Sequence, residues 1–538
     1  MDAKIEQLIS AVLLSFGDNR TILVDALKIL LTKHKYSKLN SDTTPISIDE
    51  FLSKLATINE KEKRRKTEGV YYTPKDVTEY IVANTFLTYC EVTEQVYPVD
   101  RCLEFIQNNT TFVENIKRAK VFDPTCGAAE FLLTALQIKV RIAQSVDALS
   151  DDVMCELVST IHGNDIAPTS IDLTKLRLFF YSVNLLKDKS KAKCIAKTLN
   201  RNTSKEDFIV REHNRKKYDI VLGNPPYIEY GGLKIKPSTK FGNSYADVMT
   251  NSIDCLKKDG TIGFVIPLSF VSTPRMERLR DITYDKLQTL YVLNFADRPD
   301  CLFNGVHQKL TILFGKIGND KCNVYSSSYT YWYQQDRDTF LNACQIYPVK
   351  VSDQFIPKIG NPIECEIFEN IIQQDGQSIL DIMQAGGDKS VYLNMRGCFW
   401  MKAFTFNPGS AEYNELRCSS DMQPYLTCIL NSSIFFLFWT IVSDCWHITN
   451  KELSLFKIPK IDSTQRFLSL ATALQNKLEE TKKYIGSKQV EYEYKHRDCK
   501  KEIDDIDEAL QQIFNLTDTQ IEYIKNYKLN YRMSNGKI

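Results

Sequence analysis

The stretch "KVFDPTCGAAEFLL", residues 120–133, combines a short apolar strand, a tight turn and the start of a helix. We expect the strand to end at Asp123, the turn to contain Gly127 and the helix to begin near Ala129. Such a unit brings backbone N–H groups close to a ligand at the edge of a sheet. The G-x-G-x-x-G fingerprint of dinucleotide-binding proteins is missing from it. Taken alone, the stretch is explained equally well by a purely structural turn.

Apolar segments alternate with helical segments on both sides of this unit, from residue 67 to residue 318. Further strands are expected at "IHGNDI" (161–166), "YDIVLGN" (218–224), "GTIGFVIP" (260–267) and "LTILFGK" (310–316). Segments with helical periodicity, such as "SIDLTKLRLFFYSVNLL" (170–186), lie between them. This alternation predicts an α/β fold with a Rossmann-like, mostly parallel sheet and helices on both faces. Ligands of such sheets bind at the carboxyl ends of the strands.

The rest of the 538-residue chain follows other patterns, and two to four domains are expected at this length. Residues 1–66 are predicted to be a helical N-terminal region. Residues 319–462 are rich in aromatic and turn-forming residues, which predicts an irregular α+β domain. Residues 463–538 are charged and helical in pattern.

Composition narrows the class of protein. The net charge is +1, so binding to a polyanion must come from local patches. The start of the chain lacks the pattern of a signal peptide, and the longest apolar run, 434–442, is too short for a membrane span. We therefore expect a cytoplasmic protein without a membrane partner, in which residues 434–442 are buried. Fifteen scattered cysteines without a C-x-x-C pair, and six dispersed histidines, predict reduced thiols and no metal site.

Two further acidic residues follow predicted strands. Asp165 ends "IHGND" and could accept hydrogen bonds from both ribose hydroxyls of a nucleoside, although a helix N-cap explains it equally well. Asp207 and Phe208 precede the strand at 218–224, and a carboxylate beside an apolar ring suits the amino group and face of adenine. As an isolated pair, Asp207 and Phe208 would carry no signal.

The stretch "KKYDIVLGNPPYIEYGG", residues 216–232, favours a functional over a purely structural explanation of these motifs. Two prolines end the strand and stiffen the corner that holds Asn224 and Tyr227. The exocyclic amine of a nucleobase is a poor nucleophile, because its lone pair is delocalised into the ring. Two fixed acceptors, the Asn224 amide oxygen and the Pro225 carbonyl, could hold both N–H groups and direct the lone pair at an electrophilic methyl. A base must leave the duplex to reach such a corner, where Tyr227 offers a ring for stacking.

The motifs, in this order, resemble those of amino-group DNA methyltransferases, specifically adenine-N6 enzymes of the γ class. "TEGVYYTPKDVTEYIV" (67–82) resembles the family's N-terminal motif, "DPTCGAAEFL" its methyl-donor loop and "NPPY" its catalytic motif. "YADVMTNSIDCLKKDGTIGFVIPLSF" (245–270) resembles the helix and strand that follow. Asn224 stands where cytosine-N4 enzymes usually have serine, which favours adenine. The resemblance covers residues 67–316.

The resemblance implies S-adenosylmethionine as the cofactor and assigns a role to each matching position. It implies that Tyr72, Thr73 and Pro74 contact the methionine part, with Asp123 and Gly127 beside it. It further implies ribose binding by Asp165 and adenine binding by Asp207 and Phe208, with the target-base pocket formed by Asn224, Pro225, Pro226, Tyr227 and, opposite Tyr227, Phe303. Ala129 stands where the family usually has a second glycine, which leaves weaker cofactor binding or dependence on a partner open.

Residues 319–462 resemble the target recognition domains of type II and type IIG enzymes. Residues 506–524 resemble the helical ending of such enzymes. The implied partner is double-stranded DNA, with a cognate restriction endonuclease or a specificity subunit as further candidates. Lys234, Lys236 and Lys240 could contact phosphates, although a solvated loop explains them equally well.

Three alternatives remain open from the sequence. The Asn-Pro-Pro-Tyr motif also serves enzymes that methylate RNA adenine or a glutamine side chain of a protein. A fusion that both cleaves and methylates is disfavoured, because residues 1–66 lack an acidic pair followed by E-x-K. A modification subunit that needs a partner for activity would use its terminal helices for docking.

Overall fold

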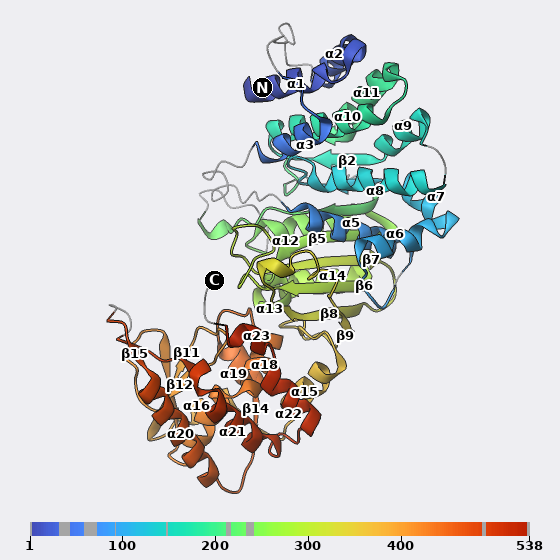
Figure 1. Ribbon diagram of the computed structural model, residues 1–538. Coiled ribbons are helices and arrows are strands. Elements are labelled where there is room, and N and C mark those ends of the chain that lie inside the picture. The colour runs from blue at the N-terminus through green and yellow to red at the C-terminus, as the bar shows by residue number, and fades with distance from the viewer. Residues whose placement is uncertain are drawn as a thin grey trace.

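The computed structural model describes residues 3–31, 44–58, 73–91, 93–146, 149–210, 217–232, 241–486 and 491–534. Its centre is a nine-stranded sheet with the order β3-β2-β1-β4-β5-β7-β6-β8-β9 (Figure 1). The strands are β1 (Val121–Asp123), β2 (Ile161–Asn164), β3 (Thr203–Ser204), β4 (Tyr218–Gly223), β5 (Leu256–Pro267), β6 (Leu287–Phe295), β7 (Leu310–Ile317), β8 (Asn323–Thr330) and β9 (Tyr347–Pro348).

Strands β1 to β5 pair in parallel, and β7 runs antiparallel between β5 and β6. The carboxyl ends of β1, β2, β3, β4 and β5 therefore meet at one edge of the sheet, where the sequence places its unusual residues. The predicted α/β fold with a mostly parallel sheet is confirmed. The sheet continues through β8, which is parallel to β6, and β9 to Pro348, beyond the boundary that we placed at residue 318.

Both faces of the sheet are buried, and the pattern of β4 shows why. Ile220 and Leu222 face one apolar cluster, and Val221 between them faces the other. Successive side chains of a strand point to opposite faces, so a strand covered on both sides must be apolar throughout.

Helices cover the two faces unequally. The Ile220 face is covered by α5 (Lys75–Cys90), α6 (Val99–Gln107), α7 (Thr110–Arg118), α8 (Glu130–Val146), α9 (Asp151–Ser159), α10 (Pro168–Leu185) and α11 (Ala192–Asn202). The Val221 face is covered by α12 (Ser244–Asp254), α13 (Ser269–Ser272) and α14 (Glu277–Lys286). The predicted helical N-terminal region contains α1 (Ala3–Leu14), α2 (Arg20–Leu30) and α3 (Ile48–Thr57), which pack on α10 and α11 and extend the same apolar cluster.

The C-terminal region is a mixed structure below the sheet in Figure 1. Its helices are α15 (Pro362–Ile372), α16 (Ile379–Ala385), α17 (Met422–Asn431), α18 (Ser433–Val442), α19 (Asn450–Leu455), α20 (Gln465–Thr481), α21 (Lys500–Gln511), α22 (Asp518–Asn526) and α23 (Leu529–Arg532). Its strands are β10 (Gly376–Ser378), β11 (Lys389–Asn394), β12 (Ala403–Phe404), β13 (Tyr413–Cys418), β14 (Lys457–Pro459), β15 (Lys483–Tyr484) and β16 (Tyr492–Glu493). The apolar cluster of the Val221 face runs on into this region, so the two share one core.

Residues 434–442 lie in α18, and all their side chains are buried in this shared core, as the sequence predicts. Among the described residues, no single helix is long and apolar enough to cross a membrane. The pair α17 and α18 reaches the required length only jointly, and it is bent by 62°.

Candidate active site

The loop after β1 is closed by bonds from its own backbone to two carboxylates. The N–H of Thr125 donates to Oδ1 of Asp123 (2.9 Å), and the N–H of Gly127 donates to Oδ2 of Asp165 (3.0 Å). Gly127 has a φ of +54°, a left-handed conformation that glycine adopts without a steric penalty. A Cβ atom placed on Gly127 would meet no other atom within 4 Å, so the loop faces open space there. Backbone turned to open space beside a carboxylate fits the polar parts of S-adenosylmethionine.

Asp165 connects two strand ends. Besides the bond from Gly127 in the β1 loop, its Oδ1 accepts a hydrogen bond from the N–H of Ala167 (2.8 Å). Helix α10 begins at Pro168 with Ala167 as its N-cap residue, so Asp165 is not the N-cap that the sequence left as an alternative. Its carboxylate is half-buried at the sheet edge, which leaves the ribose-binding role as our prediction.

Asn164, the last residue of β2, is a structural residue of the site that sequence reasoning missed. It is 2% exposed, and its Nδ2 donates to the carbonyls of Pro124 (3.0 Å) and Glu206 (2.9 Å). Its Oδ1 accepts hydrogen bonds from the hydroxyl of Ser204 (2.9 Å) and the N–H of Glu206 (3.1 Å). One amide thus joins the loops after β1 and β3. Its position directly before Asp165 at a strand end was the available signal.

Asp123 is a buried carboxyl group whose pKa is strongly shifted. It is 2% exposed, and burial raises its pKa to about 8, with a further rise from the nearby charge of Asp165. The chain of β4 passes so close that a Cβ on Gly223 would lie 2.8 Å from Oδ1 of Asp123. Gly223 therefore lets the end of β4 lie directly beside the loop after β1.

Asp207 and Phe208 lie in the loop after β3. Phe208 is 7% exposed, and its ring lies 5.7 Å from that of Phe122 on β1. Phe208 and Phe122 line a cavity of about 80 Å³ together with Asn164. Asp207 is exposed and accepts a hydrogen bond from the N–H of Ile209 (3.0 Å). The structure thus places the predicted adenine-binding pair beside Asn164.

The corner after β4 is held by side chains from distant parts of the chain. Nδ2 of Asn224 donates to Oγ1 of Thr73 (3.0 Å), which is buried just before α5. Oδ1 of Asn224 accepts a hydrogen bond from the hydroxyl of Tyr227 (2.6 Å), and the same hydroxyl lies 2.9 Å from the carbonyl of Val265 on β5. Both ends of the Asn224 amide are therefore fixed, and Thr73 is brought to the Asn-Pro-Pro-Tyr corner itself.

The two prolines complete the corner. Pro225 is buried, and the carbonyl of Pro226 accepts a hydrogen bond from the hydroxyl of Ser244, which also accepts one from the N–H of Ile228 (2.8 Å). Ser244 is the first residue of α12, so this helix supports the corner from the Val221 face. Pro74 is buried and is the N-cap residue of α5, next to Thr73.

Phe303 lies in the loop between β6 and β7 and is only 1% exposed. Arg337 ties this loop to the start of α5, because it donates to the carbonyl of Leu302 (3.0 Å) and pairs with Asp76 (2.7 Å). The ring of Tyr245 on α12 lies 6.4 Å from that of Tyr227 and nearly perpendicular to it. Stacking of a base between Tyr227 and Phe303 stays a prediction.

Ala129, the departure from the family pattern, has a φ of +69°. A non-glycine residue rarely adopts this conformation, since it costs about 1–2 kcal/mol. The loop is held here by Arg177, which is 4% exposed, donates to the carbonyl of Ala128 and forms an ion pair with Glu130. The buried ion pair stabilises the conformation in which Ala129 is strained.

Several predicted residues lie outside the described residues: Tyr72, Lys234, Lys236 and Lys240. Within the described residues, no group of three or more histidine, cysteine, aspartate or glutamate side chains could hold a metal ion. None of the fifteen cysteines, which all lie within the described residues, forms a disulfide bond.

Comparison with known proteins bears on this geometry. Residues 159–300, which include β4 and the Asn-Pro-Pro-Tyr corner, match the family described as "Eco57I restriction-modification methylase". A protein of Methanocaldococcus jannaschii, described as a "Putative type II restriction enzyme and methyltransferase", is 24% identical over 169 residues. The match covers 26% of this chain and only 14% of that protein.

Two solved structures match this chain, and the first of them, with a TM-score above 0.5, is similar in fold. The type IIL restriction-modification enzyme MmeI in complex with DNA matches 91% of this chain and 82% of its own, with 12% identity and a TM-score of 0.52. The type IIG restriction endonuclease BpuSI matches 73% of this chain and 47% of its own, with 13% identity and a TM-score of 0.40. The sequence match confirms the predicted resemblance to restriction-modification methylases, since residues 159–300 are similar to the Eco57I methylase family.

Proposed function

We propose that this chain is a site-specific DNA methyltransferase, which transfers a methyl group from S-adenosylmethionine to N6 of adenine in duplex DNA as part of a restriction-modification system. The observation that carries the proposal is the fixed amide of Asn224, held by Thr73 and Tyr227 at the end of β4. This corner lies directly beside the loop after β1, where Gly223 meets Asp123.

The first task of the site is to make the adenine amine nucleophilic. Oδ1 of Asn224 and the carbonyl of Pro225 are the two acceptors that would take its N–H groups. Because Nδ2 of Asn224 is bound to Thr73, the amide is oriented with Oδ1 away from Thr73 and toward Tyr227. An acceptor fixed before the base arrives costs no reorganisation during the reaction.

Oδ1 of Asn224 can be released to the base without leaving a buried hydroxyl unsatisfied. The Tyr227 hydroxyl has one hydrogen and two acceptors in reach, Asn224 and the carbonyl of Val265. When the amine of a base takes over Oδ1, the tyrosine hydrogen is donated to Val265. The tyrosine ring then remains as the wall of the base pocket.

S-adenosylmethionine supplies the electrophilic methyl group when it is bound. The residues that would hold it are those of the loops after β1, β2 and β3: Asp123, Gly127, Asp165, Asp207 and Phe208, with Thr73 and Pro74 at the methionine end. Asn164 and the Arg177–Glu130 pair keep these loops in register. The cytoplasm is the proposed location, since its reducing conditions preserve free cysteines.

The test is methyl transfer from radiolabelled S-adenosylmethionine to unmethylated genomic duplex DNA, followed by single-molecule sequencing. We expect N6-methyladenine at one short sequence and a loss of about 10²-fold or more with Asn224→Ala. Asn526→Ala on α22, an exposed asparagine, is the matched control and should keep full activity. Activity that appears only with a second protein would identify a modification subunit, and methylation of RNA or protein alone would contradict the proposal.

A further inference from the structure

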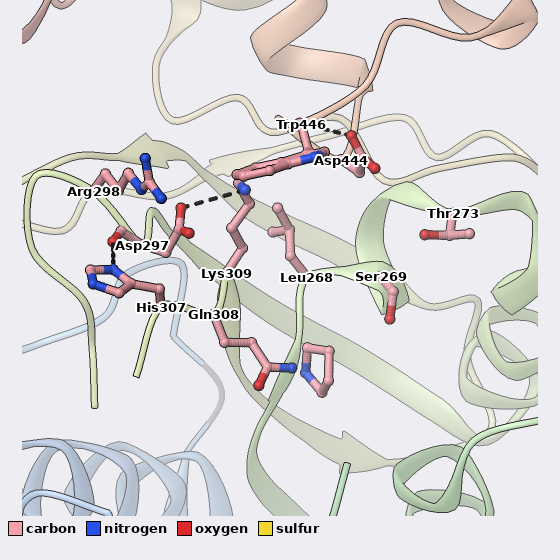
Figure 2. Close-up of a pocket in the computed structure, with 11 residues that line it drawn as sticks. Leu268, Ser269, Thr273, Asp297, Arg298, His307, Gln308, Lys309, Asp444 and Trp446 are labelled. Atoms are coloured by element: carbon pink, nitrogen blue, oxygen red, sulfur yellow. Dashed lines mark hydrogen bonds and ion pairs between the residues drawn. The ribbon is translucent and has the colours of Figure 1, made fainter. Parts of the chain in front are cut away.

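A pocket of about 360 Å³ lies between the carboxyl edge of the sheet and the C-terminal region (Figure 2). This volume is within the range of small-ligand sites. One wall follows β5, a second is the loop between β6 and β7, and the third comes from the loop after α18. The residues that carry the argument are Ser269, Asp297, Arg298, Lys309, Asp444 and Trp446.

Side chains connect this pocket to the catalytic corner. Ser269 on the pocket wall is hydrogen-bonded to the hydroxyl of Tyr245 (2.8 Å). The ring of Tyr245 packs against Tyr227, which bonds to Asn224. The pocket and the corner that holds Asn224 are therefore connected through Ser269, Tyr245 and Tyr227.

Trp446 is the exposed aromatic residue of the pocket. Its side chain is 37% exposed, whereas Trp332, Trp400 and Trp439, the other tryptophans of the chain, are 1–8% exposed. Its backbone is fixed at both ends, since its N–H donates to Asp444 (2.8 Å) and its carbonyl accepts from the N–H of Gly397 (2.9 Å). A large ring held in place while open to solvent suits the stacking of a flat ligand.

Two cations, Lys309 and Arg298, and two carboxylates, Asp297 and Asp444, line the pocket around the ring. The ammonium of Lys309 lies 4.2 Å from the centre of the Trp446 ring and 3.4 Å from Asp297, as Figure 2 shows. The other carboxylate of the pocket, Asp444, is occupied by the N–H groups of Trp446 and His447. Arg298 is exposed at the rim, and no carboxylate of the described residues lies within ion-pair distance of it. An aromatic surface beside a cation is the combination that binds single nucleotides of DNA.

We propose that this pocket binds an unpaired nucleotide of the DNA substrate, with its base stacked on Trp446 and its phosphate held by Arg298. The inference rests on the proposed function, because it takes DNA as the substrate. Extrusion of one base leaves a gap in the stack of the duplex. A stacking surface connected to the catalytic corner through Ser269 and Tyr245 would replace part of the stacking that is lost.

The experiment uses the full chain and duplex DNA fragments of mixed sequence. Binding is followed by tryptophan fluorescence and by the access of acrylamide to the tryptophans, with S-adenosylhomocysteine present so that no methyl transfer occurs. Since the other three tryptophans are buried, the accessible emission comes mainly from Trp446. DNA should quench this emission and reduce the access of acrylamide. Trp446→Phe should bind DNA but lose the signal, which assigns the signal to this residue.

Affinity separates stacking from phosphate contact. Trp446→Leu should weaken DNA binding about tenfold, by the same factor at low and high salt, because stacking involves no counterion release. Arg298→Gln should reduce the slope of affinity against salt by about one phosphate contact. Tyr484→Leu, an exposed aromatic residue in β15, is the control and should bind normally.

Unchanged Trp446 emission on DNA binding, or normal affinity of Trp446→Leu, overturns the inference. If Trp446→Leu folds poorly, normal affinity of Trp446→Phe combined with quenching in the wild type still supports it. The design distinguishes failure of the proposed function from failure of the pocket inference. Quenching without methyl transfer would contradict the proposed methyltransferase activity but support the nucleotide pocket. Methyl transfer combined with normal DNA affinity of Trp446→Leu would contradict the nucleotide pocket alone.

Discussion

The two loops at the carboxyl edge of the sheet, one after β1 and one after β4, are stabilised in different ways. The loop after β1 is held by backbone N–H groups on carboxylates and by the buried Arg177–Glu130 pair. The corner after β4 is held by neutral side chains, Thr73 from a distant part of the chain and Tyr227 from the corner itself. The first loop is thus tied to the folding core, whereas the second is held by neutral hydrogen bonds, which in the proposed function are exchanged when a base enters. Substitutions in the first should change stability, and substitutions in the second should change turnover.

The largest effect is expected from Arg177→Met, which breaks the buried pair of the first loop. Glu130 is 15% exposed and would keep a buried charge without its partner, which typically costs about 3–5 kcal/mol. Thermal unfolding should show a large fall in melting temperature. Adding Glu130→Gln should recover most of it, and Arg101→Met, which breaks the exposed pair with Glu104, should cost under about 1 kcal/mol. A small effect of Arg177→Met would show that the loop does not depend on this pair.

The second-largest effect is expected in the pH dependence of folding stability, to which the carboxyl group of Asp123 contributes. Burial raises the pKa of Asp123 in the folded state to about 8, so folding favours its neutral form. Its stabilising contribution is therefore complete below about pH 4, the pKa of an unfolded aspartate, and is lost as the pH rises from there to 8. Asp123→Asn, which is neutral at every pH, should lose less stability between pH 5 and pH 8 than the wild type.

The measurement is the apparent melting temperature of both proteins at one-unit steps from pH 5 to pH 8, without cofactor. Asp507 in α21 also has a pKa raised by burial, to about 7, and Asp507→Asn serves as the comparison from the C-terminal region. Parallel pH profiles of wild type and Asp123→Asn would mean that Asp123 is ionised throughout.

Thr73→Val tests the second loop. Valine has the shape of threonine but cannot accept the hydrogen bond from Nδ2 of Asn224. We expect kcat to fall about tenfold, the value of roughly one hydrogen bond in a preorganised site, with little change in the KM of S-adenosylmethionine. Thr73→Ser should retain most of the activity. A raised KM with normal kcat would instead support the methionine contact that the family resemblance implies.

The sequence predicted the sheet better than it predicted the contacts among the candidate site residues. Apolar strands buried on both faces are readable as continuous runs, and the segments that end at Asp123 and run into Asn224 became β1 and β4. The bond between Thr73 and Asn224 joins residues 151 positions apart, and no local pattern encodes such a contact. The same holds for Asn164, whose role arises only when the ends of three strands meet.

Phe303 is a residue whose place in a loop could be predicted from the sequence but whose burial could not. The sequence selects it by its place before a late strand, and the structure places it in a loop tied to the start of α5 through Arg337. Its low exposure, however, follows from the packing of residues that are distant in the chain. Position along the chain therefore predicts the loop, but not whether the ring is accessible to a base.

The smallest effect is expected at Ala129, where the sequence left weaker cofactor binding open. Ala129→Gly removes the left-handed strain of about 1–2 kcal/mol but also loses a buried methyl group and adds chain entropy, each about 0.5–1 kcal/mol. These terms nearly cancel, so the melting temperature should change little. Ala129→Val keeps the strain, adds β-branching and has no room in a fully buried position, and it should destabilise the loop clearly.

Isothermal titration with S-adenosylmethionine decides the functional question, since equal affinity of wild type and Ala129→Gly would show that alanine serves this loop as well as glycine. A clear gain in affinity with glycine would instead mean that the strain at Ala129 weakens cofactor binding in the natural chain.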